Sequence, residues 1–182
     1  MFKRVVLIFL STSNFSTREG TIHAIISECQ IQGITLNTQI AYVLATVKRE
    51  TGDTFKPVRE GDWIGHSVSD EYRRNNFRYY PYYGRGYVQI TWDYNYRRYS
   101  EKLGVDLFNY PDLTLEPSNS LFILVDGFKF GVFTGKKISD YINESETDFY
   151  NARRCINGLD HAAEIKGFAE SFLIDLNNGA LS

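Results

Sequence analysis

Apolar residues recur with helical spacing in several parts of the chain. The clearest stripe occupies positions i, i+3, i+4 and i+7 of a predicted helix: Ile40, Val43, Leu44 and Val47. Asn37 or Thr38 can cap this helix, because their side chains accept hydrogen bonds from free backbone N–H groups. The same period predicts a helix over 22–29, ended by Gly33, and a last helix over 162–176. Most of the chain is therefore expected to be helical.

The apolar run at 2–10 has two interpretations. Its spacing fits an amphipathic helix with one core-facing stripe. Lys3 and Arg4, followed by the uninterrupted apolar stretch 5–10 and then by serines, also resemble a weak secretory signal. The stretch 5–10 is shorter than the usual apolar region of about seven to fifteen residues, and no Ala-x-Ala cleavage site follows. We favour the helix and keep the signal as the alternative.

The helical period disappears between Gly52 and Tyr83. Gly, Pro, Asp, Asn and Arg accumulate there, which predicts long functional loops with one short helix near 69–75. The following segment, 87–92, alternates in the order Tyr-Val-Gln-Ile-Thr-Trp. Alternation of this kind predicts a short strand whose even-numbered residues share one face.

The rest of the chain completes a mainly α prediction with a small β element, in the α+β class. A helix is expected over 95–103, a turn over 109–112, and a further helix capped by Ser118. At 182 residues the chain fits one domain with a buried core. Within that domain we expect a helical segment at 1–36 packed on a core at 37–178.

Composition excludes several classes of protein. A formal net charge of -2 argues against a protein that binds nucleic acid, which normally has a basic excess. Cys29 and Cys155 fit no metal or redox motif and are expected to be free buried thiols. The three histidines lack metal-ligand spacing, so no metal site is predicted. No stretch reaches the length of a membrane span, so no stable membrane insertion is expected.

Glu50 is the carboxylate that the helical pattern singles out. It lies three residues after Val47, so its side chain projects from the apolar stripe if the helix extends that far. Loss of hydration there would raise the pKa of the carboxyl, as a general acid in glycoside hydrolysis requires. The alternative is a structural Glu in a local ion pair. An inverting hydrolase also needs a second carboxylate about 6.5 to 9.5 Å away to activate water. Four acids of the following loops are candidates: Glu60, Asp62, Asp70 and Glu71.

Several short motifs follow one another in a fixed order from the predicted helix onward. They lie at 41–46 and 50–52, 57–60, 82–92, 95–96, 103–107, 111–113, and 152–158 without residue 155. Together these motifs resemble the glycoside hydrolases of family 19, in particular their phage-endolysin-like branch, over about 40–176. The resemblance implies a lysozyme-like, two-lobed helical domain with a central cleft. It also implies inverting cleavage of β-1,4 bonds between N-acetylated sugars.

Carried over by position, the resemblance assigns roles to seven residues. Glu50 corresponds to the general acid and Glu60 to the general base, which ranks Glu60 above Glu71. Thr91 corresponds to a hydroxyl that holds the attacking water. Four further residues correspond to positions that bind the sugar: Tyr83, Gln89, Asn95 and Asn157. For each of these four, a purely structural role in the core, a strand or a turn is the alternative.

One residue departs from the family pattern. The family commonly has His before the catalytic Glu, and this chain has Arg49. A permanent cation there would lower the pKa of the acid and narrow the acidic side of the activity range. The sequence also contains neither disulfides nor the Cys-rich chitin-binding module of plant relatives, which favours a bacterial or phage origin.

The leading functional hypothesis from the sequence is a peptidoglycan hydrolase of the endolysin type. It would be made in the cytoplasm of a bacterium or phage host and act on the cell wall. The second hypothesis is a chitinase, because the same two carboxylates serve either polymer. The third is a glycan-binding domain without catalysis. None of these requires a cofactor, and a monomer is expected, with a polysaccharide as the partner.

Overall fold

The structure, a computed structural model, describes residues 14–62 and 66–181. The helices are α2 (Arg18–Gln32), α3 (Asn37–Glu50), α4 (Asp70–Asn76), α5 (Asp93–Leu103), α6 (Pro117–Phe130) and α7 (Ala162–Asn177). Short 3-10 helices are η1 (Pro111–Leu115), η2 (Ile138–Asp140) and η3 (Asn151–Cys155). Strands β1 (Val58–Arg59) and β2 (Arg85–Gly86) pair antiparallel, with Val58 opposite Gly86. The predicted helix or signal at 2–10 lies outside the described residues.

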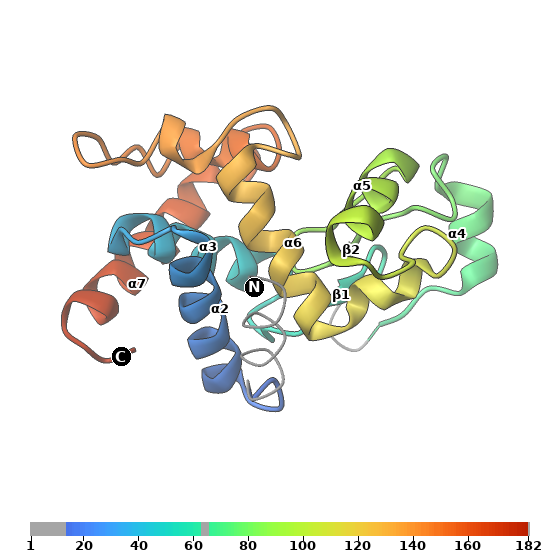
Figure 1. The fold of residues 1–182 in the computed structure, drawn as a ribbon, viewed down its shortest axis with the longest axis horizontal. Coiled ribbons are helices and arrows are strands. Elements are labelled where there is room, and N and C mark those ends of the chain that lie inside the picture. Colours follow the sequence, from blue (N-terminus) through green and yellow to red (C-terminus); the bar gives the residue numbers. More distant parts are fainter. Residues whose placement is uncertain (1–13, 63–65, 182) are drawn as a thin grey trace.

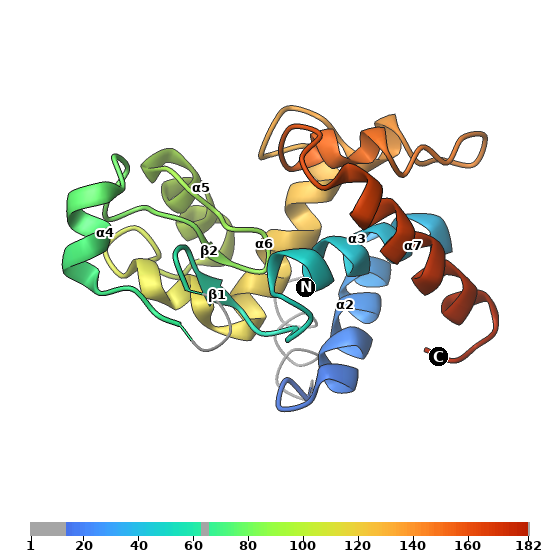
Figure 2. The ribbon, with the colours of Figure 1, turned by 180° about the vertical axis from the view of Figure 1, so that it is seen from behind.

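The protein has the predicted mainly helical α+β architecture in two lobes. One lobe contains α2, α3 and α7, and the other contains the two strands, α4 and α5 (Figure 1). Helix α6 runs from the second lobe into the first, and Figure 2 shows α3 extending from the first lobe toward the strands. The C-terminal end of α3 therefore lies where the two lobes meet.

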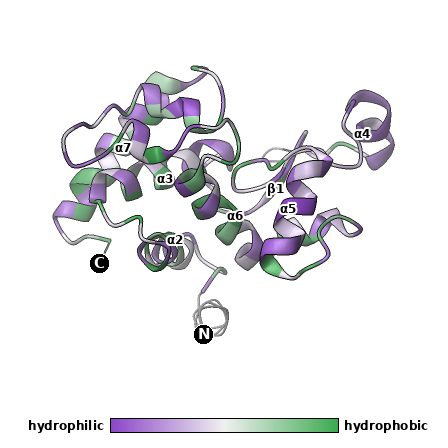
Figure 3. Ribbon diagram, turned by 45° about the horizontal axis from the view of Figure 1, so that its top comes forward, coloured by the Kyte–Doolittle hydropathy of each residue, from purple (hydrophilic) through white to green (hydrophobic). Residues whose placement is uncertain are grey.

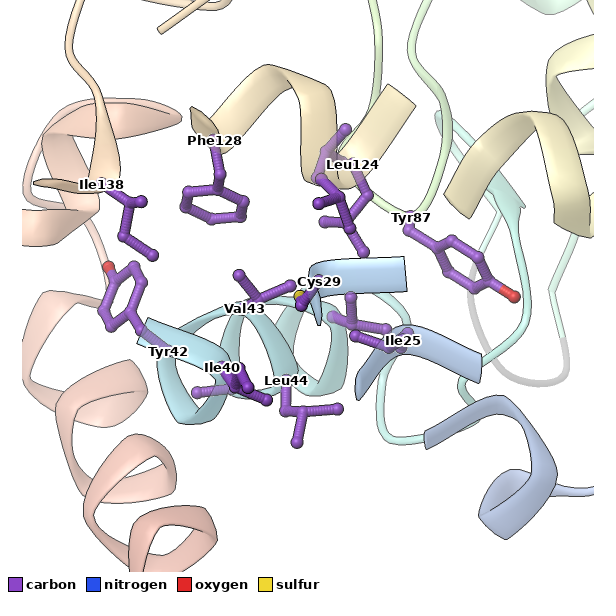
Figure 4. Packing of buried hydrophobic residues seen from close by; sticks show 14 of the residues in the cluster. Ile25, Cys29, Ile40, Tyr42, Val43, Leu44, Tyr87, Leu124, Phe128 and Ile138 are labelled. Carbon is purple, nitrogen blue, oxygen red and sulfur yellow. The ribbon is translucent and has the colours of Figure 1, made fainter. Parts of the chain in front are cut away.

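Helix α3 is the central element of the hydrophobic core. Its stripe from Ile40 to Val47 is buried, and the helix packs along α7 while also contacting α2 and α6. Tyr42 contacts Phe128 edge-on at 6.0 Å and stacks on Phe149 at 6.1 Å between ring centroids. Figure 4 shows Tyr42 beside Ile138 and Val43 facing α6. Each fully buried side chain of this size contributes about 1.5–3 kcal/mol, so the core holds the end of α3 firmly in place.

The helix predictions from periodicity are largely confirmed, but two predicted caps are wrong. Helix α2 ends at Gly33, whose φ of 82° is the left-handed conformation that glycine adopts without strain. Helix α3 starts after Leu36, which makes no side-chain cap, and Asn37 instead bonds Asn177 of α7 at 2.9 Å. Ser118 lies inside the first turn of α6, because Pro117 starts that helix with a preset φ and no N–H to satisfy.

The predicted strand at 87–92 is also wrong. This segment is a tight turn closed by the Arg85–Ile90 bridge, with Gln89 at φ 55° and Trp92 at φ 75°. Tyr87, Val88 and Ile90 are buried, whereas Gln89, Thr91 and Trp92 are partly exposed, so burial does not follow the alternation. The backbone N–H of Tyr87 donates to Ser120 Oγ of α6 at 2.8 Å. A short alternating apolar run thus reflects burial in a turn as readily as pairing in a sheet.

Hydrophobic residues concentrate on the helices of the first lobe and on α6, while α4 and α5 are more polar (Figure 3). Helix α2 shares one hydrophobic core with α3 and α6. The two cysteines are free and buried, which confirms that prediction. Over the described ranges, no helix combines the length and apolar character needed to cross a bilayer.

Candidate active site

A cavity of about 480 Å³ lies between the two lobes. Six of the seven residues assigned from the sequence line it: Glu50, Glu60, Gln89, Thr91, Asn95 and Asn157. Aromatic side chains complete its wall: Tyr79, Trp92, Tyr94 and Phe133. Concave sites of this volume with aromatic walls and a few convergent polar groups are typical of small-molecule and sugar binding. Residues more than 100 positions apart in the chain are therefore brought to one site.

Glu50 is the last residue of α3 and reaches the cavity from the first lobe. Its side chain is 19% exposed, and Arg153 Nη1 donates a hydrogen bond to its Oε1 at 2.7 Å. Arg153 belongs to η3, is buried, and is itself held by a hydrogen bond from Nε to the carbonyl of Asp160 at 3.1 Å. The surroundings of Glu50 thus include a buried cation as well as the apolar stripe that the sequence predicted. Arg153 orients the carboxyl toward the cavity.

Arg49 points away from this carboxyl. Its Nη2 lies 2.8 Å from Nε2 of His161, and its Nε lies 2.9 Å from Oε2 of Glu164. Both partners belong to the start of α7, which packs along α3. The cation in contact with Glu50 is therefore Arg153, and Arg49 links the end of α3 to α7.

Glu60 follows β1 and reaches the cavity from the second lobe. Its Oε1 accepts from the Tyr79 hydroxyl at 2.8 Å, and its Oε2 accepts from the Gly84 N–H at 2.8 Å. Burial, together with the hydrogen bond and charge of Glu60, raises the pKa of Tyr79 to about 12, so the phenol remains a donor at neutral pH. Two donors suit an ionised carboxylate, which can only accept. The arrangement matches what a general base requires.

Gly84 permits the close approach that fixes Glu60. A Cβ atom at this position would lie 2.8 Å from Gln89 Oε1 and 3.2 Å from Glu60 Oε2. Such a contact would force both side chains to move. Gln89 in turn donates from Nε2 to the carbonyl of Val58 at 3.0 Å, and this bond ties the turn at 87–92 to β1.

Thr91 and Asn95 lie side by side on the cavity wall. The Thr91 hydroxyl donates to the Gln89 carbonyl at 2.8 Å, so its oxygen is left to accept a hydrogen bond from a water molecule. Asn95 Nδ2 donates to the Thr91 carbonyl at 2.9 Å. Asn95 Oδ1 is buried and has no hydrogen-bond partner among the described residues. A buried acceptor of this kind is costly unless a ligand supplies the missing donor.

Of the remaining predicted residues, one lines the cavity and the others lie outside it. Asn157 is exposed on the loop after η3 and contributes to the cavity wall from the first lobe. Tyr83 does not line the cavity: it is 3% exposed, and its ring lies under the guanidinium of Arg85, 3.6 Å from Cζ to the ring centroid. Tyr83 therefore has a structural role in the second lobe's packing and does not contact the space where a sugar would bind in this cavity. Glu71 is exposed on α4, outside the cavity, so Glu60 is better placed as the base.

Two polar residues of the site are not predicted from the sequence. Arg153 was present only as part of a family motif, and no local pattern connects it with Glu50. No sequence motif or spacing distinguishes Tyr79 from the other tyrosines of its loop. No group of three or more His, Cys, Asp or Glu residues in 14–62 and 66–181 is placed to hold a metal ion.

Comparison with known proteins identifies the relatives of this chain. The glycoside hydrolase family 19 model, described as chitinase class I, matches residues 35–124. A basic endochitinase of Brassica napus is 28% identical over 153 residues, which cover 81% of this chain and 52% of that protein. An endochitinase of Arabidopsis thaliana is 32% identical over 107 residues, or 54% of this chain and 34% of that protein.

Shorter stretches match more closely. An endochitinase of Pisum sativum is 59% identical over 32 residues, which cover 18% of this chain and 10% of that protein. The chain spans about half the length of the Brassica napus relative and smaller shares of the other two. The matched segment 35–124 contains both Glu50 and Glu60, together with the turn at 87–92. This chain therefore belongs to glycoside hydrolase family 19, the family of class I chitinases.

Proposed function

We propose that this protein is a glycoside hydrolase that cleaves β-1,4 bonds in polymers of N-acetylglucosamine, with chitin as the leading substrate. The observation that carries the proposal is that Glu50 and Glu60 line one cavity from opposite lobes. Arg153 contacts the carboxyl of Glu50, and two donors hold the carboxylate of Glu60. Membership of family 19 supports the same chemistry.

In the proposed reaction Glu50 donates a proton to the glycosidic oxygen as the bond to the anomeric carbon breaks. Arg153 on Oε1 balances the negative charge that this transfer leaves on Glu50. A water molecule held by the Thr91 oxygen attacks the anomeric carbon from the opposite side. Glu60 takes the proton of that water, and the new hydroxyl group has inverted configuration.

The choice between polymers rests on the relatives. The sequence alone placed peptidoglycan first, but the named relatives are plant endochitinases, so chitin now leads. Peptidoglycan remains the second candidate, because the motifs over about 40–176 together resemble the endolysin-like branch and the backbone of peptidoglycan also contains β-1,4 bonds between N-acetylated sugars. Both are wall polymers, so we propose an extracytoplasmic site of action.

The test is a comparison of products from the two polymers. The purified protein is incubated with soluble oligomers of N-acetylglucosamine and, separately, with purified peptidoglycan, and the products are identified by mass spectrometry. We expect shorter oligomers from the chitin series, with the inverted anomer formed first by NMR. Soluble fragments from peptidoglycan, without cleavage of the chitin oligomers, would show that peptidoglycan and not chitin is the substrate. Binding without cleavage of either polymer would overturn the enzymatic proposal in favour of a glycan-binding domain.

A further inference from the structure

A second hollow of about 620 Å³ lies on the lobe that contains the strands, α4 and α5. It shares no lining residue with the cavity of Glu50 and Glu60. Asp70 and Tyr80 form one side, and η1 with the preceding Tyr110 forms the other. We propose that this hollow is a second binding site for a neutral polysaccharide, the same amino-sugar polymer that the catalytic cavity takes. The inference rests on the proposed function for the identity of that polymer.

Tyr110 provides an aromatic surface at the edge of the hollow. It is 63% exposed, so most of the ring is accessible to a ligand. Its N–H donates to the Asp106 carbonyl at 3.2 Å, and its carbonyl accepts from the Leu113 N–H at 3.0 Å. Its backbone is therefore held in place, and stacking a sugar ring on the phenol would require little ordering of the protein. The apolar face of a pyranose is a suitable partner for such a ring.

Tyr80 presents a second ring in the same hollow. Its hydroxyl donates to Asp70 Oδ2 at 2.9 Å, and its ring stacks at 6.2 Å on the buried ring of Tyr83. Tyr83 is held under Arg85, so the support beneath Tyr80 is rigid. The buried Tyr83, which sequence reasoning assigned to the catalytic cleft, thus contributes to this second hollow instead.

The charges of the hollow favour a neutral ligand rich in donors. Three carboxylates line it, against one guanidinium: Asp70, Asp112, Glu116 and Arg85. Asp112 is paired with Arg59 at 2.7 Å and Arg85 at 2.8 Å, and Asp70 is paired with Arg74 at 3.7 Å. Among the described residues, Glu116 is therefore the one lining carboxylate without an ion pair. Sugar hydroxyls and acetamido N–H groups donate to carboxylates, whereas an acidic polymer meets guanidinium groups that are already paired and an unpaired carboxylate at Glu116.

A second site would increase the binding and hydrolysis of an insoluble polymer. Attachment through the hollow raises the local concentration of chain ends and loops near the catalytic cavity, without altering the chemical step. The expected signature is therefore a defect on insoluble polymer that is absent on short soluble oligomers.

The experiment compares Tyr110→Ala with Tyr150→Ala, a matched control at a tyrosine that is 43% exposed and lies outside both cavities. Binding to insoluble chitin and hydrolysis of both insoluble chitin and soluble oligomers are measured. We expect Tyr110→Ala to weaken binding to insoluble chitin by about three- to tenfold and to leave soluble hydrolysis unchanged. Equal melting temperatures of the two variants exclude a folding defect.

Two results would overturn the second site. The first is that Tyr110→Ala binds and hydrolyses insoluble chitin as well as Tyr150→Ala does. The other is a Tyr110-dependent affinity for acidic peptidoglycan but not for chitin, because the unpaired carboxylate of Glu116 disfavours an acidic polymer. Failure of the starting protein to cut soluble oligomers would overturn the proposed function instead. The binding comparison on chitin would still decide whether the hollow is a site.

Discussion

Arg153 Nη1 donates to Glu50 Oε1 at 2.7 Å, joining residues 103 positions apart at the wall of the catalytic cavity. The arginine is buried and the carboxyl is mostly so. Removing one member of such a pair leaves an uncompensated charge away from water. The geometry of the proposed acid therefore depends on η3 as much as on its own helix.

Substituting Arg153 by Ala is expected to destabilise the fold and reduce activity together. Loss of a partner from a buried ion pair costs about 3–5 kcal/mol, measurable as the free energy of unfolding in urea. Arg153→Lys keeps the charge but loses the bond to the Asp160 carbonyl, so we expect an intermediate effect. The control is Arg154→Ala, whose side chain is exposed. Similar stability and kcat in the Ala variants at 153 and 154 would contradict the role of Arg153.

Arg49→Ala tests whether the departure from the family pattern affects the acid. Arg49 contacts His161 and Glu164, whose side chains are about half exposed, and exposed pairs contribute about 0–1 kcal/mol. We expect a small loss of stability and an unchanged acidic limb in the pH profile of kcat/KM. A double-mutant cycle with Glu164→Ala measures the coupling. A clear displacement of the acidic limb would show that Arg49 acts on the acid after all.

Tyr79→Phe removes one of the two donors that hold Glu60. A hydrogen bond to a charged group is worth about 1.5–3 kcal/mol, so we expect kcat to fall about tenfold or more on soluble oligomers. The matched control is Tyr80→Phe, because that hydroxyl bonds Asp70 outside the catalytic cavity. If Tyr79→Phe were as active as Tyr80→Phe, the phenol would have no part in positioning the base.

Alkaline pH should destabilise the protein. Burial raises the pKa of Tyr79 and Tyr96 from 10.0 to about 12, so the folded state holds these protons more tightly than the unfolded chain. The associated stability is fully present below about pH 10 and is lost as the pH rises through about 12. Urea unfolding across that interval measures it, and Tyr79→Phe should show a smaller loss. A free energy of unfolding that stays constant up to pH 12 would contradict this prediction.

The sequence predicted the helices well because their apolar stripes reflect burial directly. The stripe from Ile40 to Val47 is the centre of the core, and Gly33 ends α2 as its missing Cβ allows. Six of the seven residues assigned through the family motifs line one cavity, and their catalytic and binding roles stay predictions. Glu50 and Glu60 are only ten residues apart, and the loop between them returns to the same cavity.

Other features depend on contacts that no local pattern records. The pairing of Glu50 with Arg153 is set by the packing of η3 near α3 and α7, far along the chain. The alternation at 87–92 arises from a buried turn with left-handed residues, which period alone does not separate from a strand. Tyr83 belongs to a family motif, but its side chain packs under Arg85 on the other side of that turn.

The most direct test of the catalytic account is the activity of Glu50→Gln beside Glu71→Gln on soluble oligomers of N-acetylglucosamine. The amide at 50 keeps the shape of the side chain and the contact with Arg153 but has no acidic proton to donate. We predict that kcat falls by at least about a hundredfold in Glu50→Gln while oligomer binding survives, and that Glu71→Gln behaves like the unmodified protein. Retention of full activity by Glu50→Gln would contradict the assignment of Glu50 as the proton donor.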